Sequence, residues 1–281
     1  MNNLENVFIV KFLRRSTKRT MIVSLVKNGT GMKDNLNLIS GVSNMKRQRL
    51  QYKPIEGTLA LLDGDILCYR IGFTTQDVDE KITLSRINSY LDNILFDSGA
   101  SDYIVYLTGS NNFRKTIYPD YKANRIQEKP KHYELIREYL MNHEAAIMCE
   151  EEEADDVMGY SQTEHTIICS IDKDLDQIPG RHFNFVKNQH YYVTPEEGLF
   201  FFYQQLLTGD RVDNIPGLPK VGPVKAKKIL GEWVDEQDAK TKTLKAYQEL
   251  LGLDEEKARE RISLIGKLLW IRKKENEFWE F

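Results

Sequence analysis

Residues 59–63 read Leu-Ala-Leu-Leu-Asp, a short apolar run that ends in a carboxylate. Two later stretches follow the same pattern: residues 103–107 are apolar and end before Thr108-Gly109, and residues 166–169 end just before Asp172. Helix-compatible stretches separate the three runs. Short, continuous apolar strands of this kind are typical of a parallel sheet that is covered on both faces. The sequence therefore predicts an α/β fold with a mostly parallel central sheet flanked by helices.

Acidic residues gather where these strands and the later helices begin or end. In open parallel sheets the ligand site lies beyond the carboxyl ends of the strands, which is where Asp63 and Asp172 fall. A single acidic group of this kind is often a turn or a helix cap, and an acidic run is often a solvated helix start. Four groups together, without matching His or Cys, favour hard divalent cations. The four groups are residues 63–65, 150–156, 172–174 and 210–213.

Two such cations, roughly 3.5–4 Å apart, would support phosphodiester hydrolysis without a nucleophilic side chain. The sequence agrees with that chemistry, because it contains no recognisable Ser/His/Asp or Cys/His motif. The phosphate-binding pattern GxxxxGK[ST] does not occur either, so an ATPase has no support.

The composition limits the class of protein. The 281 residues fit one large domain, or a domain with a smaller helical one. The three cysteines lack CxxC spacing and the five histidines lack HxxxH spacing, so we expect no structural zinc. No apolar run approaches the ~20 residues of a membrane helix, and no secretory leader is visible. We expect a monomer in the cytoplasm of a bacterial or phage-infected cell, without membrane contact.

The first 57 residues differ from the rest of the chain. They hold eleven Lys or Arg against three Asp or Glu, and they show little periodicity. We predict a basic, poorly structured N-terminal extension over residues 1–57. Phosphate attraction is the functional alternative, and an organellar transit peptide over the acid-poor residues 8–23 is a further one.

Helical signals dominate the last third. Thr194-Pro195-Glu196-Glu197 is a capping box with proline at the first helical position, which predicts a helix to about Leu207. Gly222-Pro223 predicts another helix that ends near Leu230. Residues 240–251 and 254–269 carry two more helical patterns.

Five motifs occur in the order seen in flap endonuclease-type 5′-nucleases, and the chain resembles that family, above all the bacteriophage 5′→3′ exonucleases and the 5′-nuclease domain of bacterial DNA polymerase I. The motifs are LDGD at 62–65, YKANR at 121–125, EADDVMG at 153–159, SIDKD at 170–174 and GDRVDNIPG at 209–217. The resemblance covers residues 59–230. It implies a PIN-like α/β catalytic domain over 58–207 with an arch around 113–135. It also implies a helical DNA-binding region over 208–281 with a helix–three-turn–helix.

The resemblance also implies a set of site residues. A first site for Mg²⁺ or Mn²⁺ would use Asp63, Glu153, Asp155 and Asp156, and a second would use Asp172, Asp174, Asp210 and Asp213. The catalytic residues would be Lys122, Arg125, Asp156 and Asp174. One departure matters: the family usually has an Asp after the second strand, whereas this chain has Thr108-Gly109-Ser110. The first site would then depend on water, Asp65 or Glu152.

Basic and aromatic residues indicate a nucleic-acid surface, because cations neutralise phosphates and rings stack on unpaired bases. In residues 217–228, which resemble the family's helix–three-turn–helix, glycines let backbone N–H groups approach a phosphate at a helix start. The resemblance also implies a possible K⁺ ion held by the backbone carbonyls of this hairpin. The predicted DNA contacts are Arg114, Lys115, Tyr121, Lys122 and Arg125 in the arch, with Gly217, Lys220, Gly222, Lys225, Lys227 and Lys228 in the hairpin.

The sequence thus predicts a divalent-metal-dependent 5′→3′ exonuclease, with or without flap endonuclease activity, in DNA replication or repair. Its partners would be duplex 5′ ends, nicks or 5′ flaps, with RNA/DNA hybrids left open. A PIN-type ribonuclease and a non-catalytic DNA-binding relative are the alternatives. The hairpin argues against the first, and the retained carboxylates argue against the second.

Overall fold

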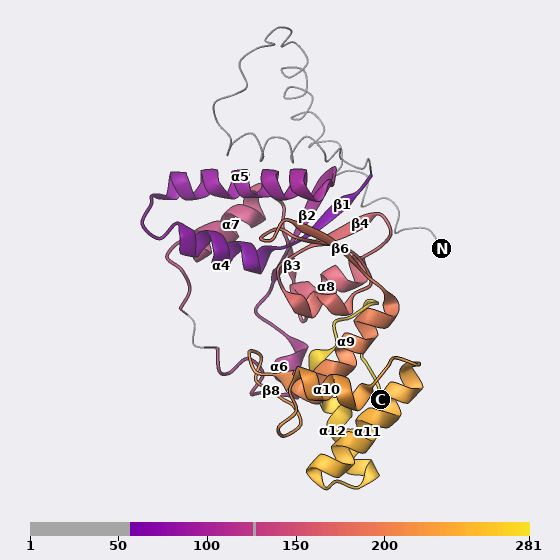
Figure 1. Cartoon of the computed structure of the whole chain (residues 1–281). Helices are drawn as coiled ribbons and strands as arrows, with labels where there is room; N and C mark the ends of the chain where they lie inside the picture. Colours follow the sequence, from indigo (N-terminus) through magenta and orange to yellow (C-terminus); the bar gives the residue numbers. More distant parts are fainter. Residues whose placement is uncertain (1–56, 126–127) are drawn as a thin grey trace, which may run out of the picture. The chain divides into compact units, whose positions relative to one another are not determined.

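The computed structural model describes residues 57–125 and 128–281, so nearly all of the predicted N-terminal extension lies outside the described residues. A six-stranded sheet in the order β3-β2-β1-β4-β5-β6 forms the centre (Figure 1). Strands β1 to β5 run parallel, and β6 pairs antiparallel with β5. The strands are β1 (Leu59–Asp63), β2 (Asp102–Thr108), β3 (Ile147–Cys149), β4 (Thr166–Cys169), β5 (Gly180–Asn184) and β6 (Gln189–Val193). The predicted α/β fold with a mostly parallel sheet is confirmed.

Side chains alternate along the central strands and build two cores. Ala60 and Leu62 of β1 face the core beneath helices α4 (Gly64–Thr74), α5 (Glu80–Ser98) and α7 (Tyr133–His143). Leu61 points the opposite way, into a second core with helix α8 (Ala154–Ser161). Because successive side chains of a strand point to opposite faces, an unbroken apolar strand requires both layers.

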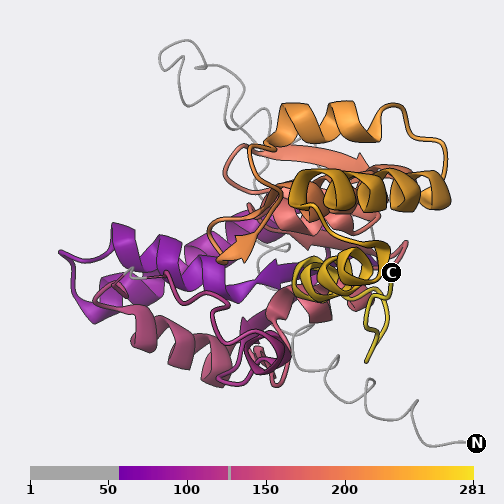
Figure 2. The same cartoon turned by 90° about the horizontal axis from the view of Figure 1, so that it is seen from below.

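The last third of the chain is helical, with a short connecting ladder of β7 (Gly209–Asp210) and β8 (Ile215–Pro216). Helix α9 (Pro195–Thr208) begins with the predicted capping box and proline. It is followed by α10 (Pro223–Leu230), α11 (Glu236–Leu251) and α12 (Glu255–Leu269). These helices share one hydrophobic core around Phe202 and Tyr203, and the end of the chain lies beside α12, where Trp279 packs on Gly266 (Figure 2).

Helix α9 also packs against the short 3₁₀ helix η1 (Lys173–Gln177) that follows β4. The helical region is therefore in direct contact with the carboxyl end of a central strand. Within the described part of the chain, no helix has both the length and the apolar character that crossing a bilayer requires. The division at residues 207 and 208 stays a prediction.

Candidate active site

The last residue of β1, Asp63, occupies the carboxyl edge of the sheet between β2 and β4. Its Oδ1 accepts the Ile66 N–H at 3.1 Å and caps α4, while its Oδ2 accepts the Ser170 hydroxyl at 3.1 Å. Burial, followed by the charges of Asp65 and Asp172, raises the pKa of Asp63 to about 7. The end of this central strand thus holds the Asp63 carboxyl group where burial disfavours its charged form.

Asp172 and Asp174 follow the neighbouring strand β4. Asp172 caps η1 by accepting the Asp174 N–H at 2.9 Å. Burial raises the pKa of Asp174 to about 8, and the charges of Asp172, Asp210 and Asp213 add to the effect. Charges change each other's pKa values in this way only over short distances, so the segments around β4 and β7 lie close together.

Asp155, in the first turn of α8, completes this group. Burial raises its pKa well above the ordinary value, and Asp63, Asp172 and Glu153 are the next causes. Carboxylates from four separate segments of the chain therefore share one region. In residues 57–125 and 128–281, no three Asp, Glu, His or Cys side chains form a closed ligand cluster, so their roles as ligands stay predictions.

Two cations of the arch lie against the rim of the group. The Lys122 ammonium donates to Glu153 Oε1 and lies 3.6 Å from Asp213 Oδ2, and Arg125 pairs with Asp213 Oδ1. Burial alone would raise the pKa of Glu153, but the charges of Lys122 and Arg114 outweigh it and lower the pKa to about 2. Lys122 holds the left-handed backbone conformation at φ 57°, which a lysine rarely adopts.

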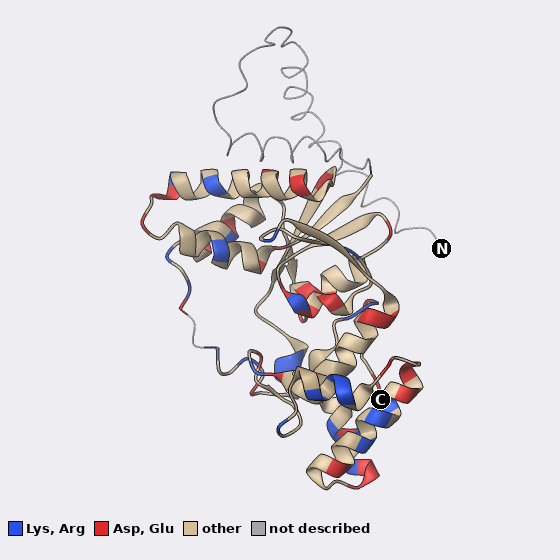
Figure 3. Cartoon of the chain, viewed as in Figure 1, with Lys and Arg blue, Asp and Glu red and all other residues tan. Residues whose placement is uncertain are grey.

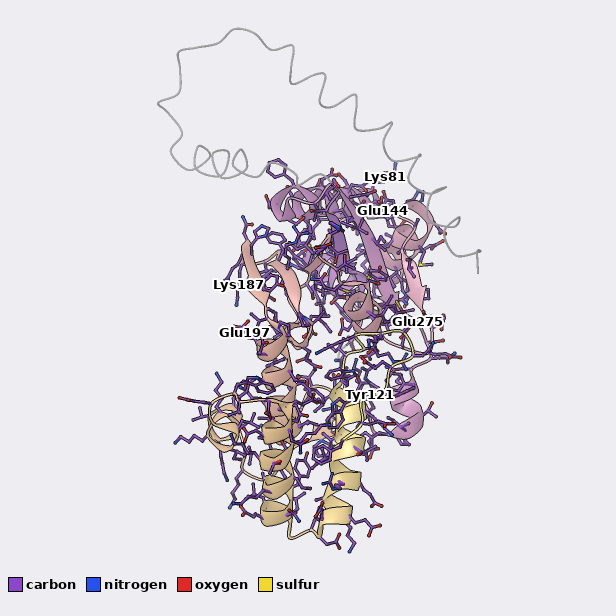
Figure 4. The ribbon with its side chains drawn as sticks, turned by 90° about the vertical axis from the view of Figure 1, so that its right-hand side faces the viewer. Lys81, Tyr121, Glu144, Lys187, Glu197 and Glu275 are labelled. Carbon is purple, nitrogen blue, oxygen red and sulfur yellow. The ribbon has the colours of Figure 1, made fainter. Side chains whose placement is uncertain are left out.

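The predicted roles of three residues need correction. Arg114 is 2% exposed and bonded to both oxygens of Asp156, so its guanidinium cannot reach DNA. Asp156 is itself fully buried, and it also accepts the Glu153 and Arg272 N–H groups, so it has no face left for a cation or for catalysis. Tyr121, labelled in Figure 4, is 3% exposed and packs with the C-terminal helices, so its ring is not available for stacking on a base.

The Tyr121 hydroxyl instead lies between two candidate ligands. It is 3.0 Å from Glu153 Oε2 and 3.0 Å from Asp213 Oδ2. Its place in the structure is therefore between the carboxylates of the two predicted cation sites.

Of the three substitutes predicted for the family's Asp (water, Asp65 or Glu152), the two carboxylates are engaged elsewhere. Asp65 accepts the Thr108 N–H at 2.9 Å and pairs with Arg137 at 2.9 Å. Glu152 pairs with Arg272 at 2.7 Å. Thr108 itself accepts the Ala154 N–H at the start of α8. Neither carboxylate is free to replace the family's Asp.

The hairpin between β8 and α10 carries the second group of predicted contacts. Gly222 precedes α10, Pro223 is its first residue, and Lys220 holds φ 56°. The lysines of this hairpin and of α10 are exposed, and their positions along the ribbon are blue in Figure 3. The exposed members are Lys220, Gly222, Lys225, Lys227 and Lys228, while Gly217 is half-buried against Thr208 and Gly209. Lys115 is exposed on α6 (Phe113–Ile117).

Sequence reasoning missed two residues that hold the site. Asn112 caps α6 and donates to Glu153 Oε1 at 2.8 Å, and Arg137 holds Asp65. An Asn directly before Phe113-Arg114 is a helix-start signal that was available in the sequence. Arg137 lies 72 positions from its partner, and no local pattern indicates that contact.

Comparisons with known proteins agree with this architecture. The family model "5′-3′ exonuclease, N-terminal resolvase-like domain" matches residues 58–201. A 5′-3′ exonuclease of Buchnera aphidicola is 31% identical over 190 residues, which are 58% of this chain and 66% of that protein. Flap endonuclease Xni of Shewanella piezotolerans is 30% identical over 195 residues, covering 60% of this chain and 74% of Xni.

The thermostable DNA polymerase I of Thermus aquaticus is 28% identical over 201 residues, which are 63% of this chain. The chain spans just under two thirds of the Buchnera relative's length and only 24% of the Thermus polymerase. Among solved structures, a DNA and metal-ion complex of bacteriophage T5 flap endonuclease matches with a TM-score of 0.51 at 20% identity, covering 75% of this chain and 95% of that one. That likeness concerns the fold.

Proposed function

The chain belongs to the 5′-3′ exonuclease family, and from that premise we propose that it is a divalent-metal-dependent 5′→3′ exonuclease that also cleaves 5′ flaps in DNA. The observation that carries the proposal is the convergence of Asp63, Asp155, Asp172 and Asp174, whose burial and mutual repulsion raise their pKa values. Burying several charged carboxylates together lowers the stability of the folded chain unless positive charge compensates them.

The donor set fits hard divalent cations. All four side chains offer carboxylate oxygen, the ligand type that hard divalent cations prefer. Two cations of the chain, Lys122 and Arg125, form their ion pairs with Glu153 and Asp213 at the rim and not with the four deeper carboxylates. The deeper carboxylates therefore have the chemistry of a Mg²⁺ or Mn²⁺ site. The metal ions printed for the T5 flap endonuclease complex support this reading.

A pair of bound cations would lower the pKa of an attacking water and offset charge on the leaving oxygen. The chain's own residues have distinct tasks. Lys122 and Arg125 are positioned to exchange their carboxylate partners for the phosphates beside the scissile bond, because a phosphate competes for the same donors. Asn112 and Tyr121 hold Glu153 in place while this exchange occurs.

DNA is the proposed partner, and the hairpin would hold the duplex away from the reacting bond. The exposed Lys225, Lys227 and Lys228 and the N–H groups at the start of α10, which no side chain of the described residues caps, suit phosphate contacts that do not read base sequence. The DNA in the T5 complex supports this assignment. A monomeric state, K⁺ at the hairpin and activity on RNA/DNA hybrids stay predictions.

The test compares three 5′-labelled DNA substrates, a flap, a nick and a blunt duplex, in Mg²⁺ and in EDTA. We expect short labelled products from all three in Mg²⁺ and none in EDTA. Asp155→Ala and Asp174→Ala are the control variants, and both are expected to be inactive. Equal degradation by the wild-type chain and both variants would show that a contaminant cleaves the DNA, and the proposal would fail.

A further inference from the structure

Two buried amides connect the helical region to Asp174. Gln205 of α9 donates from Nε2 to Asp174 Oδ1 at 2.9 Å. Its Oε1 accepts from Nε2 of Gln177, the last residue of η1, at 2.7 Å. Gln177 is 0% exposed and Gln205 is 7% exposed, so solvent does not compete for these bonds.

The backbone that follows α12 determines which atoms of the Gln177 and Gln205 amides donate and which accept. The Ile271 N–H can only donate, so the Gln177 atom that it meets at 3.2 Å must be Oε1. The Gln177 Nε2 atom then donates both of its hydrogens, one to Leu269 O at 2.8 Å and one to Gln205. Gln205 is left with its oxygen toward Gln177 and its N–H toward Asp174. The carboxylate therefore meets a donor and not an acceptor.

We infer that Gln205 is a positioning residue for Asp174, and that through Gln177 the segment Leu269–Ile271 sets the orientation of a carboxylate in the second cation site. The inference rests on the proposed function. The donor engages Oδ1, and among the hydrogen bonds of the described residues Oδ2 takes no part, so this oxygen can face a cation. Hydrogen bonds of this kind orient metal ligands, and their loss weakens metal binding by roughly 10- to 100-fold.

Gln205 could instead serve only to stabilise the packing of the fold, and this is the alternative to a positioning role. Gln205 lies beside Leu206 and Leu207 in the α9 core, so a substitution there can also loosen packing. The two roles differ in what they change. A packing role lowers thermal stability and affects both cation sites alike, whereas a positioning role weakens one site in a chain that stays folded.

The experiment measures Mn²⁺ binding to the full chain without DNA, by electron paramagnetic resonance of the free ion. The wild-type chain is expected to bind two Mn²⁺ ions. Gln205→Leu is expected to weaken one of the two sites by roughly 10- to 100-fold. Gln204→Leu, the same change at the partly exposed preceding position of α9, is the matched control and should leave both sites unchanged. In DNA cleavage, Gln205→Leu should need a higher Mg²⁺ concentration while the KM for DNA stays the same.

Gln205→Met, which keeps the length of the side chain, serves if Gln205→Leu does not fold. A folded variant with both Mn²⁺ affinities within about twofold of the wild-type values would overturn the positioning role and leave the proposed function intact. If neither variant folds, Gln205 supports the core alone, and the inference is equally lost. A wild-type chain that binds no Mn²⁺ would instead refute the proposed function, together with the role derived from it.

Discussion

Arg114 and Asp156 form a two-pronged ion pair in the interior, with Nη1 2.5 Å from Oδ2 and Nη2 2.8 Å from Oδ1. The Arg114 side chain also donates to the carbonyls of Leu268 and Trp270. The base of the arch, the start of α8 and the segment after α12 therefore meet at one guanidinium. The two residues resemble functional ones in sequence, but their contacts are those of a structural pair.

Arg114→Leu should lower the free energy of unfolding by about 3–5 kcal/mol, because it leaves Asp156 charged and buried without a partner. Urea denaturation measures this loss. Arg125→Leu is the matched control, since its pair with Asp213 is about half exposed on the arginine side and should contribute at most about 1 kcal/mol. Equal losses for the two variants would contradict the structural role of Arg114.

Asp155→Asn and Asp156→Asn should differ in the property that they change. Asp155 lies among the carboxylates of the proposed cation sites, whereas both oxygens of Asp156 are occupied. We expect Asp155→Asn to weaken Mn²⁺ binding with little loss of stability, and Asp156→Asn to lower the melting temperature with a smaller effect on Mn²⁺ binding. Calorimetry measures the Mn²⁺ affinity and the melting temperature on the same samples. A larger loss of Mn²⁺ binding in Asp156→Asn than in Asp155→Asn would support Asp156 as a ligand.

Lys122→Met should lower kcat by about 10²–10³-fold, the usual result of removing a fixed charge that stabilises a transition state. The ammonium lies within ion-pair distance of Glu153 and of Asp213, so it contacts one carboxylate from each predicted site. Single-turnover cleavage of a 5′-labelled flap is the measurement. Lys129→Met, at an exposed lysine paired with Glu134, should retain wild-type rates, and a similar loss there would point to general charge effects.

Without divalent cations, the free energy of unfolding should fall as the pH rises from about 6.5 to about 8. The folded pKa values of Asp63 and Asp174, about 7 and about 8, lie above the ordinary 3.8, so the folded chain holds protons that the unfolded chain releases. His182, whose pKa burial lowers below 6.5, acts in the opposite sense at lower pH, which fixes the lower limit of the window. Denaturation in EDTA measures the slope.

Mg²⁺ should flatten that slope, because cation binding to the folded chain stabilises the charged carboxylates. Asp63→Asn should also reduce it in EDTA. A slope that Mg²⁺ leaves unchanged would show that these carboxylates do not bind the ion.

Gly109→Ala should cost about 1–3 kcal/mol of stability. A Cβ at Gly109 would lie 2.6 Å from the Cys149 carbonyl oxygen, which is backbone and cannot move aside easily. Gly222→Ala is the control, since a Cβ there meets nothing within 4 Å and the backbone has φ −104°. A neutral result at Gly109 would mean that the loop after β2 has room for a side chain at this position.

The strands and helices that local pattern governs were well predicted. The apolar runs ending at Asp63 and Cys169 match β1 and β4, and the capping box at Thr194 begins α9 as predicted. The β5–β6 hairpin was not predicted, because residues such as Arg181, His182 and Gln189 show no clean alternation of apolar and polar side chains. There, backbone pairing with β4 decides the structure.

The sequence indicated which acidic residues come together, but not how their side chains are oriented. Asp155 and Asp156 are adjacent in sequence, yet one faces the acidic group and the other faces Arg114, since neighbouring helical residues point in different directions. The partner that decides the matter lies 42 positions away, and its burial depends on the C-terminal segment. Contacts of this range have no signature in a short motif.

The Tyr121 hydroxyl carries a single proton, although it lies within hydrogen-bonding distance of both Glu153 and Asp213. It can satisfy only one of these carboxylates at any moment. If a bound cation drew one carboxylate away from Tyr121, the hydroxyl proton would be left to the other carboxylate. Under the proposed function, the two predicted cation sites would therefore be coupled through this one hydroxyl group.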